Sequence, residues 1–322
     1  MKKFATGLLC LCLLLAGWTR SGRAQTQPAE PKPDVPAAPA SQDQTTPPQT
    51  GQPNIQAPPE MPKYPDVRMP SEHGFWIGIT GSEPTGHPIF DKGRNSGITN
   101  ASRVTMEGRP KVGEGAEAGI ALGLHNALRI SYFQTKASGS FTAPQDLTLW
   151  SQNYSQGDLV TTDYRIQDFK ISFDYLTWPY PVGSRKFRLK TLWQLQYVSL
   201  KSSFDAPLLA TTDSSGNALV DSSGNLITYQ TQGKRWFLTP TLGIGMHEYV
   251  SRHLRLEANA TGFTIPHHTT VWDIDASINI RVGHFEIGGG ARAFHFKTSS
   301  AGPYYLRGTL TAPQVTIRWF SE

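Results

Sequence analysis

Two carboxylates and a histidine form the most chemically suggestive group in the sequence. Asp273 and Asp275 are separated by one residue, and His268 precedes them. If this segment is a β-strand, side chains two residues apart share a face and lie about 7 Å from each other. Paired carboxylates beside an imidazole can activate a water molecule. The pattern therefore admits a hydrolase, either a protease or a lipid-modifying enzyme, with Asp273, Asp275 and His268 as catalytic candidates.

The same carboxylates have a structural explanation. Arg255 and Arg292 occupy segments that would neighbour theirs in an antiparallel sheet, and opposite charges inside a protein are expected to pair. No longer protease motif surrounds Asp273, and no serine and histidine follow a recognised order. We therefore favour charge pairing, and we assign no catalytic residue.

Other site chemistries find little support. His267, His268 and His295 could approach one another, but adjacent histidines on an extended chain point apart, so we predict no metal site. The sequence has no glycine-rich phosphate loop and no stripe of basic and aromatic residues. We expect no cofactor and no nucleic-acid partner.

The N-terminus has the features of an export signal. Lys2 and Lys3 precede an apolar run over residues 8–16, and small residues lead to a predicted cleavage after Ala24. The run is shorter than the roughly 20 residues that a membrane-spanning helix needs. Removing residues 1–24 also removes both cysteines and lowers the formal net charge from +5 to +1, so the apparent basicity indicates no acidic partner.

Residues 25–70 are rich in Pro, Ala, Gln and Thr and contain almost no large apolar side chain. Such a segment cannot bury a core and is expected to be a disordered, semi-rigid linker. It divides the signal peptide from a folded domain over residues 71–322. We interpret the linker as a periplasmic tether, with contact to a periplasmic partner or the cell wall as the functional alternative.

The folded part is organised around the hairpin over residues 166–200. Phe169, Ile171 and Phe173 alternate with Asp168 and Lys170, which is the period of two that a β-strand produces. Similar alternation predicts ten strands, with eight or twelve as alternatives, and a β-bulge near Ala312-Pro313, where the alternation changes phase. The predicted strands cover residues 74–81, 115–124, 127–138, 166–175, 187–197, 235–249, 254–263, 271–282, 284–297 and 304–320.

Short and long connections alternate between these strands, and no helical segment of useful length interrupts them. One long connection repeats the sequence DSSGN at 213–217 and 221–225, which predicts a protruding hairpin. The fold class is therefore all-β, an antiparallel up-and-down barrel whose closure leaves no exposed edge.

One strand face mixes charges with glycines, which suits a narrow interior better than a solvated exterior. The apolar face is then expected to meet lipid. The charges predicted to face the lumen are Glu117, Arg129, Asp168, Lys170, Asp174, Arg188, Lys190, Arg255, Glu257, Asp273, Asp275, Arg281, Glu286 and Arg292. The side chains predicted to face lipid are Phe169, Ile171, Phe173, Leu189, Trp193, Leu195, Leu242, Ile244, Ile274 and Ile278.

Segments 115–138, 166–200 and 304–320 give the chain a resemblance to bacterial outer-membrane β-barrel proteins. Members of that class usually end in an alternating strand with a terminal aromatic residue. Here Val315, Ile317 and Trp319 alternate and Phe320 follows, although Ser321-Glu322 come after it. The resemblance implies export to the outer membrane of a Gram-negative-type bacterium, insertion by the barrel-assembly machinery, contact with outer-membrane lipids, and periplasmic termini.

Three functional interpretations follow. The first is an outer-membrane barrel with a structural, adhesive or narrow-channel, porin-like role. The second is an outer-membrane hydrolase that uses Asp273 and Asp275 near the outer rim. The third is a secreted soluble β-barrel.

Overall fold

The computed structural model describes residues 74–97, 99–100, 102–123, 125–178, 187–251, 253–266 and 268–321. The chain divides into two compact units, Met1–Pro59 and Glu60–Glu322, and every described residue belongs to the second. The predicted signal peptide and linker lie outside the described residues.

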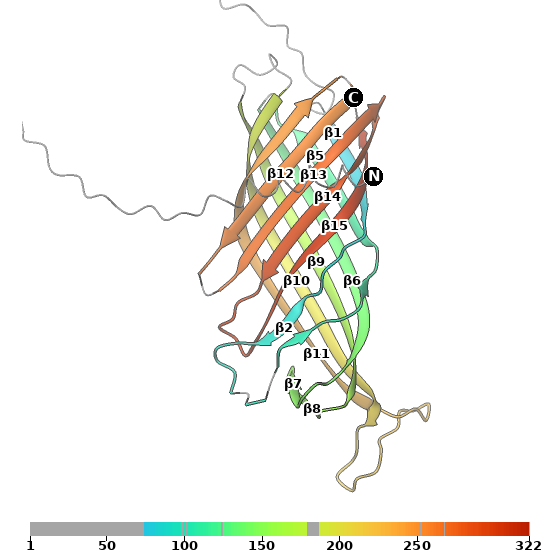
Figure 1. The fold of residues 1–322 in the computed structure, drawn as a ribbon. Coiled ribbons are helices and arrows are strands. Elements are labelled where there is room, and N and C mark those ends of the chain that lie inside the picture. Colours follow the sequence, from blue (N-terminus) through green and yellow to red (C-terminus); the bar gives the residue numbers. More distant parts are fainter. Residues whose placement is uncertain are drawn as a thin grey trace, which may run out of the picture. The chain divides into compact units, whose positions relative to one another are not determined.

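Ten long antiparallel strands form a closed ring (Figure 1). Each pairs with its neighbours along the chain, and the last pairs with the first, where Ile77 lies opposite Trp319. The prediction of a ten-stranded up-and-down barrel is confirmed. The strands are β1 (Phe75–Ser82), β5 (Gly113–Ala121), β6 (Asn126–Thr142), β9 (Leu159–Trp178), β10 (Phe187–Ala210), β11 (Thr228–Tyr249), β12 (Leu254–Thr264), β13 (Thr270–Val282), β14 (Phe285–Lys297) and β15 (Tyr304–Phe320).

Five short strands lie in two of the long connections. The first connection contains β2 (Ile89–Lys92), β3 (Val104–Thr105) and β4 (Arg109–Pro110), and the second contains β7 (Leu147–Leu149) and β8 (Gln152–Tyr154). They lie at the end of the barrel opposite the two strand termini, Phe75 and Phe320 (Figure 1). We call this the loop end and the other the termini end. None of the five is long enough to cross a membrane, so the number of spanning strands stays at ten.

The strand face that carries the apolar side chains changes along the length of the barrel. In the termini half of β9, Phe169 and Ile171 point outward and are 38% and 39% exposed, while Asp168 between adjacent outward residues is buried. In the loop half the order reverses, since Tyr164 and Ile166 are buried inside and Arg165 is exposed. The barrel therefore has an apolar exterior over a charged interior at one end, and a polar exterior over an apolar interior at the other.

This inversion corrects one sequence-based prediction. The pairing of β15 with β14 runs without interruption from Arg307 to Trp319, so no β-bulge occurs near Ala312-Pro313. The apparent change of phase arises because inward Leu310 and Ala312 are apolar whereas inward Thr316 and Arg318 are polar. The polarity of the inward and outward side chains changes along β15, whereas the alternation of side chains between the two faces continues without a break.

The aromatic residues at the two ends of β15 point inward. Tyr304 joins the apolar core of the loop half, and Phe320 is buried at the termini end. The Phe320 ring stacks on Trp76 at 6.3 Å between centroids, and the guanidinium of Arg281 lies 4.2 Å from its centroid. Gly119 faces the Trp76 ring so closely that any side chain there would displace it.

The predicted lipid-facing residues all lie on the outer face. Phe169, Ile171, Phe173, Trp193, Leu195, Leu242, Ile244, Ile274 and Ile278 are exposed, and Leu189 is half-buried. Among the described residues, no helix is long and apolar enough to cross a membrane.

The outer face of β9 gives the first test. An Ile171→Arg substitution places a charge near the middle of the apolar stretch and should destabilise the folded barrel by about 2–4 kcal/mol. Thr161→Arg, on the same face but in the loop half, should cost less than about 1 kcal/mol. Urea unfolding of the protein in lipid vesicles measures both. Equal costs would mean that the outer face of β9 does not contact lipid.

Candidate functional site

The interior of the termini half is a continuous array of charges. The structure places the charged residues named for the lumen on the inner strand faces, and most of them are buried. The residues form two groups, which we name by their central members. The Arg292 cluster comprises Asp168, Lys170, Asp273 and Arg292, and the Glu257 cluster comprises Glu117, His247, Arg255, Glu257, Glu286 and Arg318.

The Arg292 cluster joins opposite walls of the barrel. Arg292 on β14 donates from Nε to Asp273 Oδ1 at 2.9 Å, and from Nη2 to Asp273 Oδ2 at 2.6 Å and Asp168 Oδ2 at 2.7 Å. Lys170 on β9 also contacts Asp273, and its Nζ lies 3.5 Å from Asp168. The guanidinium lies over the Phe133 ring, 4.6 Å from its centroid. Each charge is therefore paired inside a region of low dielectric, where an unpaired charge would be costly.

This geometry decides between the two interpretations of the acidic pair. Both oxygens of Asp273 accept hydrogen bonds from Arg292, and Asp275 accepts one from Asn259 at 3.0 Å. The predicted pairing with Arg292 is confirmed, whereas Arg255 binds Glu257 and Glu286 instead. Asp273 and Asp275 do share the inner face of β13, but as members of a structural charge network.

The third candidate lies elsewhere. His268 is exposed in the turn between β12 and β13, where its Nδ1 is 3.5 Å from Ser299 Oγ. Val271, which is buried in the apolar core, lies between this turn and Asp273 on the strand. The carboxylates are thus inside the barrel below the apolar layer, and the prediction that they lie at the outer rim is wrong.

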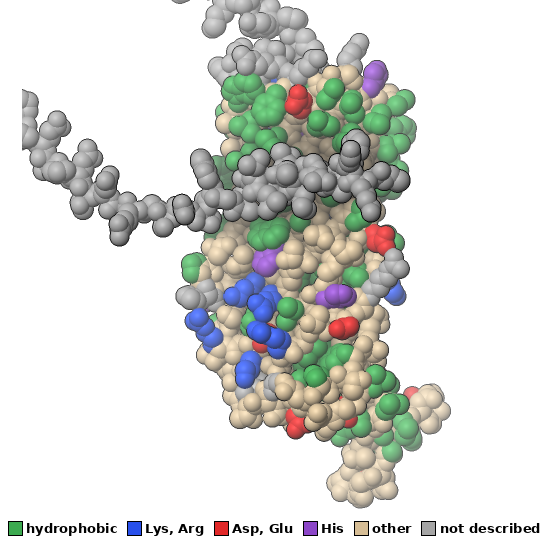
Figure 2. All heavy atoms as spheres, viewed as in Figure 1, with side chains coloured by type: hydrophobic (Ala, Val, Ile, Leu, Met, Phe, Trp, Pro, Cys, Tyr) green, Lys and Arg blue, Asp and Glu red, His purple; other side chains and the backbone are tan. Residues whose placement is uncertain are grey.

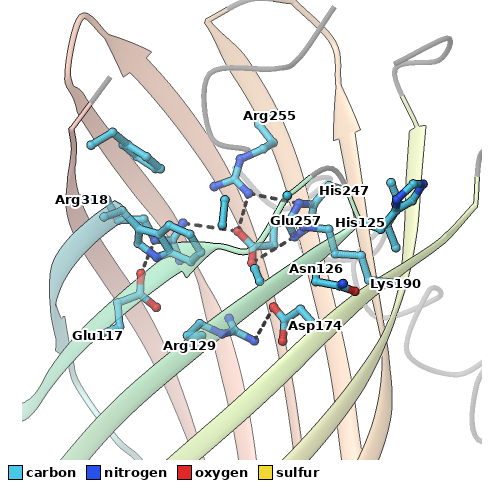
Figure 3. A pocket seen from close by; sticks show the side chains of 16 residues that line it. Glu117, His125, Asn126, Arg129, Asp174, Lys190, His247, Arg255, Glu257 and Arg318 are labelled. Atoms are coloured by element: carbon cyan, nitrogen blue, oxygen red, sulfur yellow. Dashed lines mark hydrogen bonds and ion pairs between the residues drawn. The ribbon is translucent and has the colours of Figure 1, made fainter. Parts of the chain in front are cut away.

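The Glu257 cluster lies near Trp76 and Phe320 at the termini end, and Figure 3 shows Glu117, His247, Arg255, Glu257 and Arg318 around one pocket there. The Glu257 carboxylate on β12 lies 3.0 Å from Arg255 Nη1, 3.3 Å from His247 Nε2 and 3.3 Å from Arg318 Nη1. Arg255 and Arg318 in turn share Glu286, at 2.6 and 3.1 Å. Acids and bases alternate around the inner wall, so no carboxylate or guanidinium of this cluster faces the lumen without an opposite charge.

Little free space remains between these side chains. One cavity of about 60 Å³ lies beside Glu117, His247 and Arg318, and another of about 110 Å³ lies beside Asp275 and Arg292. Volumes of this size hold on the order of ten water molecules or fewer in each cavity. The paired side chains of the two clusters therefore occupy the lumen around these cavities, as expected for a ring of this size.

An apolar plug fills the loop half of the lumen. Phe90, from β2, lies with ring centroids 5.4 Å from Phe204 on β10, 5.1 Å from Tyr304 on β15 and 5.0 Å from Trp150 in the loop between β7 and β8. In the ring, β10 and β15 lie on opposite sides. The plug consists of Phe90, Val104, Met106, Leu147, Leu149, Trp150 and Tyr154, and it packs on inward residues of the strands.

Hydrogen bonds fix the plug to the wall. Trp150 Nε1 donates to Ser202 Oγ at 3.0 Å, the Ser151 amide donates to Tyr304 Oη at 2.7 Å, and Tyr154 Oη donates to the Phe204 carbonyl at 3.2 Å. Sequence reasoning missed the plug, because its residues come from connections with no strand periodicity. The available signal was the apolar character of inward residues at the loop ends of β9 and β10.

The repeated DSSGN sequence forms two matched turns at the tip of the β10–β11 connection, which protrudes as predicted (Figure 1). Asp213 accepts the amides of Ser215 and Asn217 at 2.8 and 2.9 Å, and Asp221 accepts those of Ser223 and Asn225 at the same distances. The Asn217 amide, followed by that of Ser215, lowers the pKa of Asp213 below its usual range. The described residues contain no group of His, Cys, Asp and Glu side chains arranged to hold a metal ion.

Comparison with known proteins finds likeness at the level of the barrel. No protein-family model and no curated protein matches the chain. Among solved structures, it is similar to the outer membrane protease OmpT from Escherichia coli, with 7% identity, a TM-score of 0.47, and coverage of 78% of this chain and 97% of the other. It is also similar to Ail of Yersinia pestis, with 7% identity, a TM-score of 0.33, and coverage of 76% and 99%. It is also similar to the toluene transporter TodX of P. putida, with 8% identity, a TM-score of 0.31, and coverage of 77% of this chain and 90% of the other.

The chain's own structure supplies the assignment of its environment. The ring has no free sheet edge in its termini half, and the outer face there is a band of apolar side chains. A band of this extent is unfavourable in water, and a closed barrel is the β architecture that satisfies its backbone in hydrocarbon. The protein is an outer-membrane-type β-barrel. The alternative of a secreted soluble barrel does not fit this surface.

The Arg292 cluster gives the second test. Arg292→Gln leaves Asp168 and Asp273 with only Lys170 between them, so it should lower the free energy of unfolding by about 3–5 kcal/mol. Adding Asp273→Asn should restore part of that loss, because the double variant removes a charge of each sign. Urea unfolding in vesicles measures all three proteins.

An ion pair whose cation is exposed provides the control. Arg103 is 67% exposed and lies 2.9 Å from Asp91, so Arg103→Gln should change the unfolding free energy by no more than about 1 kcal/mol. If Arg103→Gln and Arg292→Gln cost the same, or if Asp273→Asn deepens the defect, the cluster does not hold the barrel walls together.

Proposed function

We propose that the protein is a closed, non-conducting outer-membrane barrel with a structural role, which holds the loop end as a rigid platform at the cell surface. The observation that carries this proposal is the apolar plug between β10 and β15. Ions do not cross a dry apolar layer, and the plug contains aromatic rings in direct contact with one another. The platform includes the protruding hairpin with its DSSGN turns, which offers an adhesive surface.

The charged interior supports the same proposal. The Arg292 and Glu257 clusters cross the lumen as paired acids and bases rather than lining an open water path. A narrow channel would need both the plug and these clusters to move aside. The hydrolase alternative lacks a comparable support, because Arg292 holds both oxygens of Asp273.

The ends of the barrel suggest its orientation. We propose that the termini end faces the periplasm, with residues 25–70 acting as a tether there, and that the barrel-assembly machinery inserts the chain by way of β15. The outer face of β15 carries the alternating apolar residues Val315, Ile317 and Trp319, which we propose the barrel-assembly machinery recognises as an insertion signal.

Planar-bilayer recording tests the closed state. The full chain should insert without stable single-channel currents. Insertion is verified independently by heat-modifiable migration of the recovered protein. The double variant Phe90→Ala, Trp150→Ala removes two rings from the centre of the plug and should produce brief leak currents but no stable channel, because the Arg292 and Glu257 clusters remain in place.

Gly216→Ala serves as the matched variant, because it also alters the loop end but lies in the exposed hairpin, and it should leave the recording unchanged. Steady single-channel currents from the unaltered protein would contradict the proposal and favour a narrow channel. Cleavage of peptide or lipid by the unaltered protein, abolished by Asp273→Asn with Asp275→Asn, would favour the hydrolase.

A further inference from the structure

A row of exposed cations crosses the outer wall just beyond the apolar band. Lys136 on β6, Arg165 on β9, Lys201 on β10 and Lys234 on β11 are direct cross-strand neighbours, each opposite the next. Lys111 extends the row, since its amide donates to the Lys136 carbonyl at 2.7 Å. All five side chains are exposed. We call these five residues the basic row.

The basic row lies at the level of a membrane interface. On the outer face of β9, Arg165 lies four residues before Phe169, with Gln167 between them on the same face. Tyr132 on β6 and Tyr197 on β10 lie opposite Phe169. Four residues along a tilted strand correspond to about 10 Å along the membrane normal. Lysine and arginine side chains can cover about half of that distance by snorkelling, which brings their charges to the headgroups.

Nothing within the row balances its charge. Like charges placed directly opposite each other on neighbouring strands destabilise a sheet. Arg165 donates to the neutral Gln134 at 2.7 Å, and the acid on the adjoining outward position of β9 is the single carboxylate Asp163. The hollow beside the row is lined by Lys111, Lys136, Asp163, Arg165 and Lys201 together with small or neutral residues. An anion outside the protein would remove the repulsion.

A second group of cations differs in this respect. Figure 2 shows Lys and Arg side chains gathered on the face that carries β14, β15 and β2, where Arg103, Lys297 and Arg307 lie on the outer side. Asp91 lies within that group, 2.9 Å from Arg103 and 3.9 Å from Arg307. That group has an internal acid that two of its cations share, whereas the basic row extends over four strands without one between its members.

We propose that the basic row is a binding site for phosphorylated lipid headgroups in the leaflet at the loop end of the barrel. The spacing of neighbouring strands, about 5 Å, allows adjacent cations to engage one phosphate or two linked phosphates on the same headgroup. The acyl chains of such a lipid would lie against the apolar band next to Phe169 and Tyr197. The inference rests on the proposed outer-membrane location and adds the chemistry of the lipid that it recognises.

The test measures binding of diphosphorylated lipid A to the full chain in neutral-detergent micelles by isothermal titration calorimetry. Arg165→Gln with Lys201→Gln removes the two central charges and should weaken binding about 25-fold, at about fivefold for each cation. Arg103→Gln with Lys297→Gln removes the same charge from the other group and should change binding less than threefold. Dephosphorylated lipid A should bind the unaltered protein about as weakly as lipid A binds the row variant.

Each arm has a result that overturns the proposal. Equal losses in the two double variants would mean diffuse electrostatic attraction rather than a site. Unchanged affinity for dephosphorylated lipid A would mean that the acyl chains alone are recognised. Full competition by millimolar inorganic phosphate would mean a small-anion site. Heat-modifiable migration is measured on every protein, so failure to form a membrane barrel, which would refute the proposed function, is distinguished from loss of lipid binding.

Discussion

The hydrogen-bonded ion pairs across the lumen are the interaction on which the rest of the barrel depends. A ten-stranded ring that turns its apolar side chains outward must fill its narrow centre with the side chains of the opposite strand face. Those residues include several buried charges, which are tolerated only as partners. Arg292 satisfies two carboxylates from opposite walls, Asp168 and Asp273. The pairing therefore both neutralises the interior and fixes the distance between walls that share no backbone contact.

The change of sidedness along the strands follows from two different surroundings. In the termini half the exterior is hydrocarbon, so burial inside carries no hydrophobic advantage and paired charges can fill the centre. In the loop half the exterior is aqueous, and the lumen is where apolar side chains such as Phe204 and Phe296 escape water. The same strands thus form a membrane barrel at one end and a plugged, water-soluble type of barrel at the other. The inserted connections complete the core of the second part.

The sequence predicted structure where polar and apolar side chains alternate, and it did not predict structure in the connections that lack this alternation. The period of two around Ile171 and Phe173 was sufficient to predict strands, ring and outer face, and inward placement made Asp273 and Arg292 plausible partners. Contacts such as that of Phe90 with Phe204 join residues far apart in the chain, and no local pattern encodes them. The supposed bulge near Pro313 shows the reverse error, because alternation of polarity reports the environment of each face and only indirectly the pleat.

Charges of the same kind have different consequences inside and outside this wall. Within the lumen Arg292 and Arg318 each reach carboxylates on more than one strand, because the curved sheet directs inward side chains toward one another. On the outer face the curvature directs them apart, and the residues directly opposite Lys136, Arg165, Lys201 and Lys234 across these strand pairs are other members of the row. In the proposed site, a phosphorylated headgroup supplies the compensating negative charge. A convex basic row beside a hydrophobic band is therefore matched to an amphiphile whose charged groups and acyl chains meet at the same boundary.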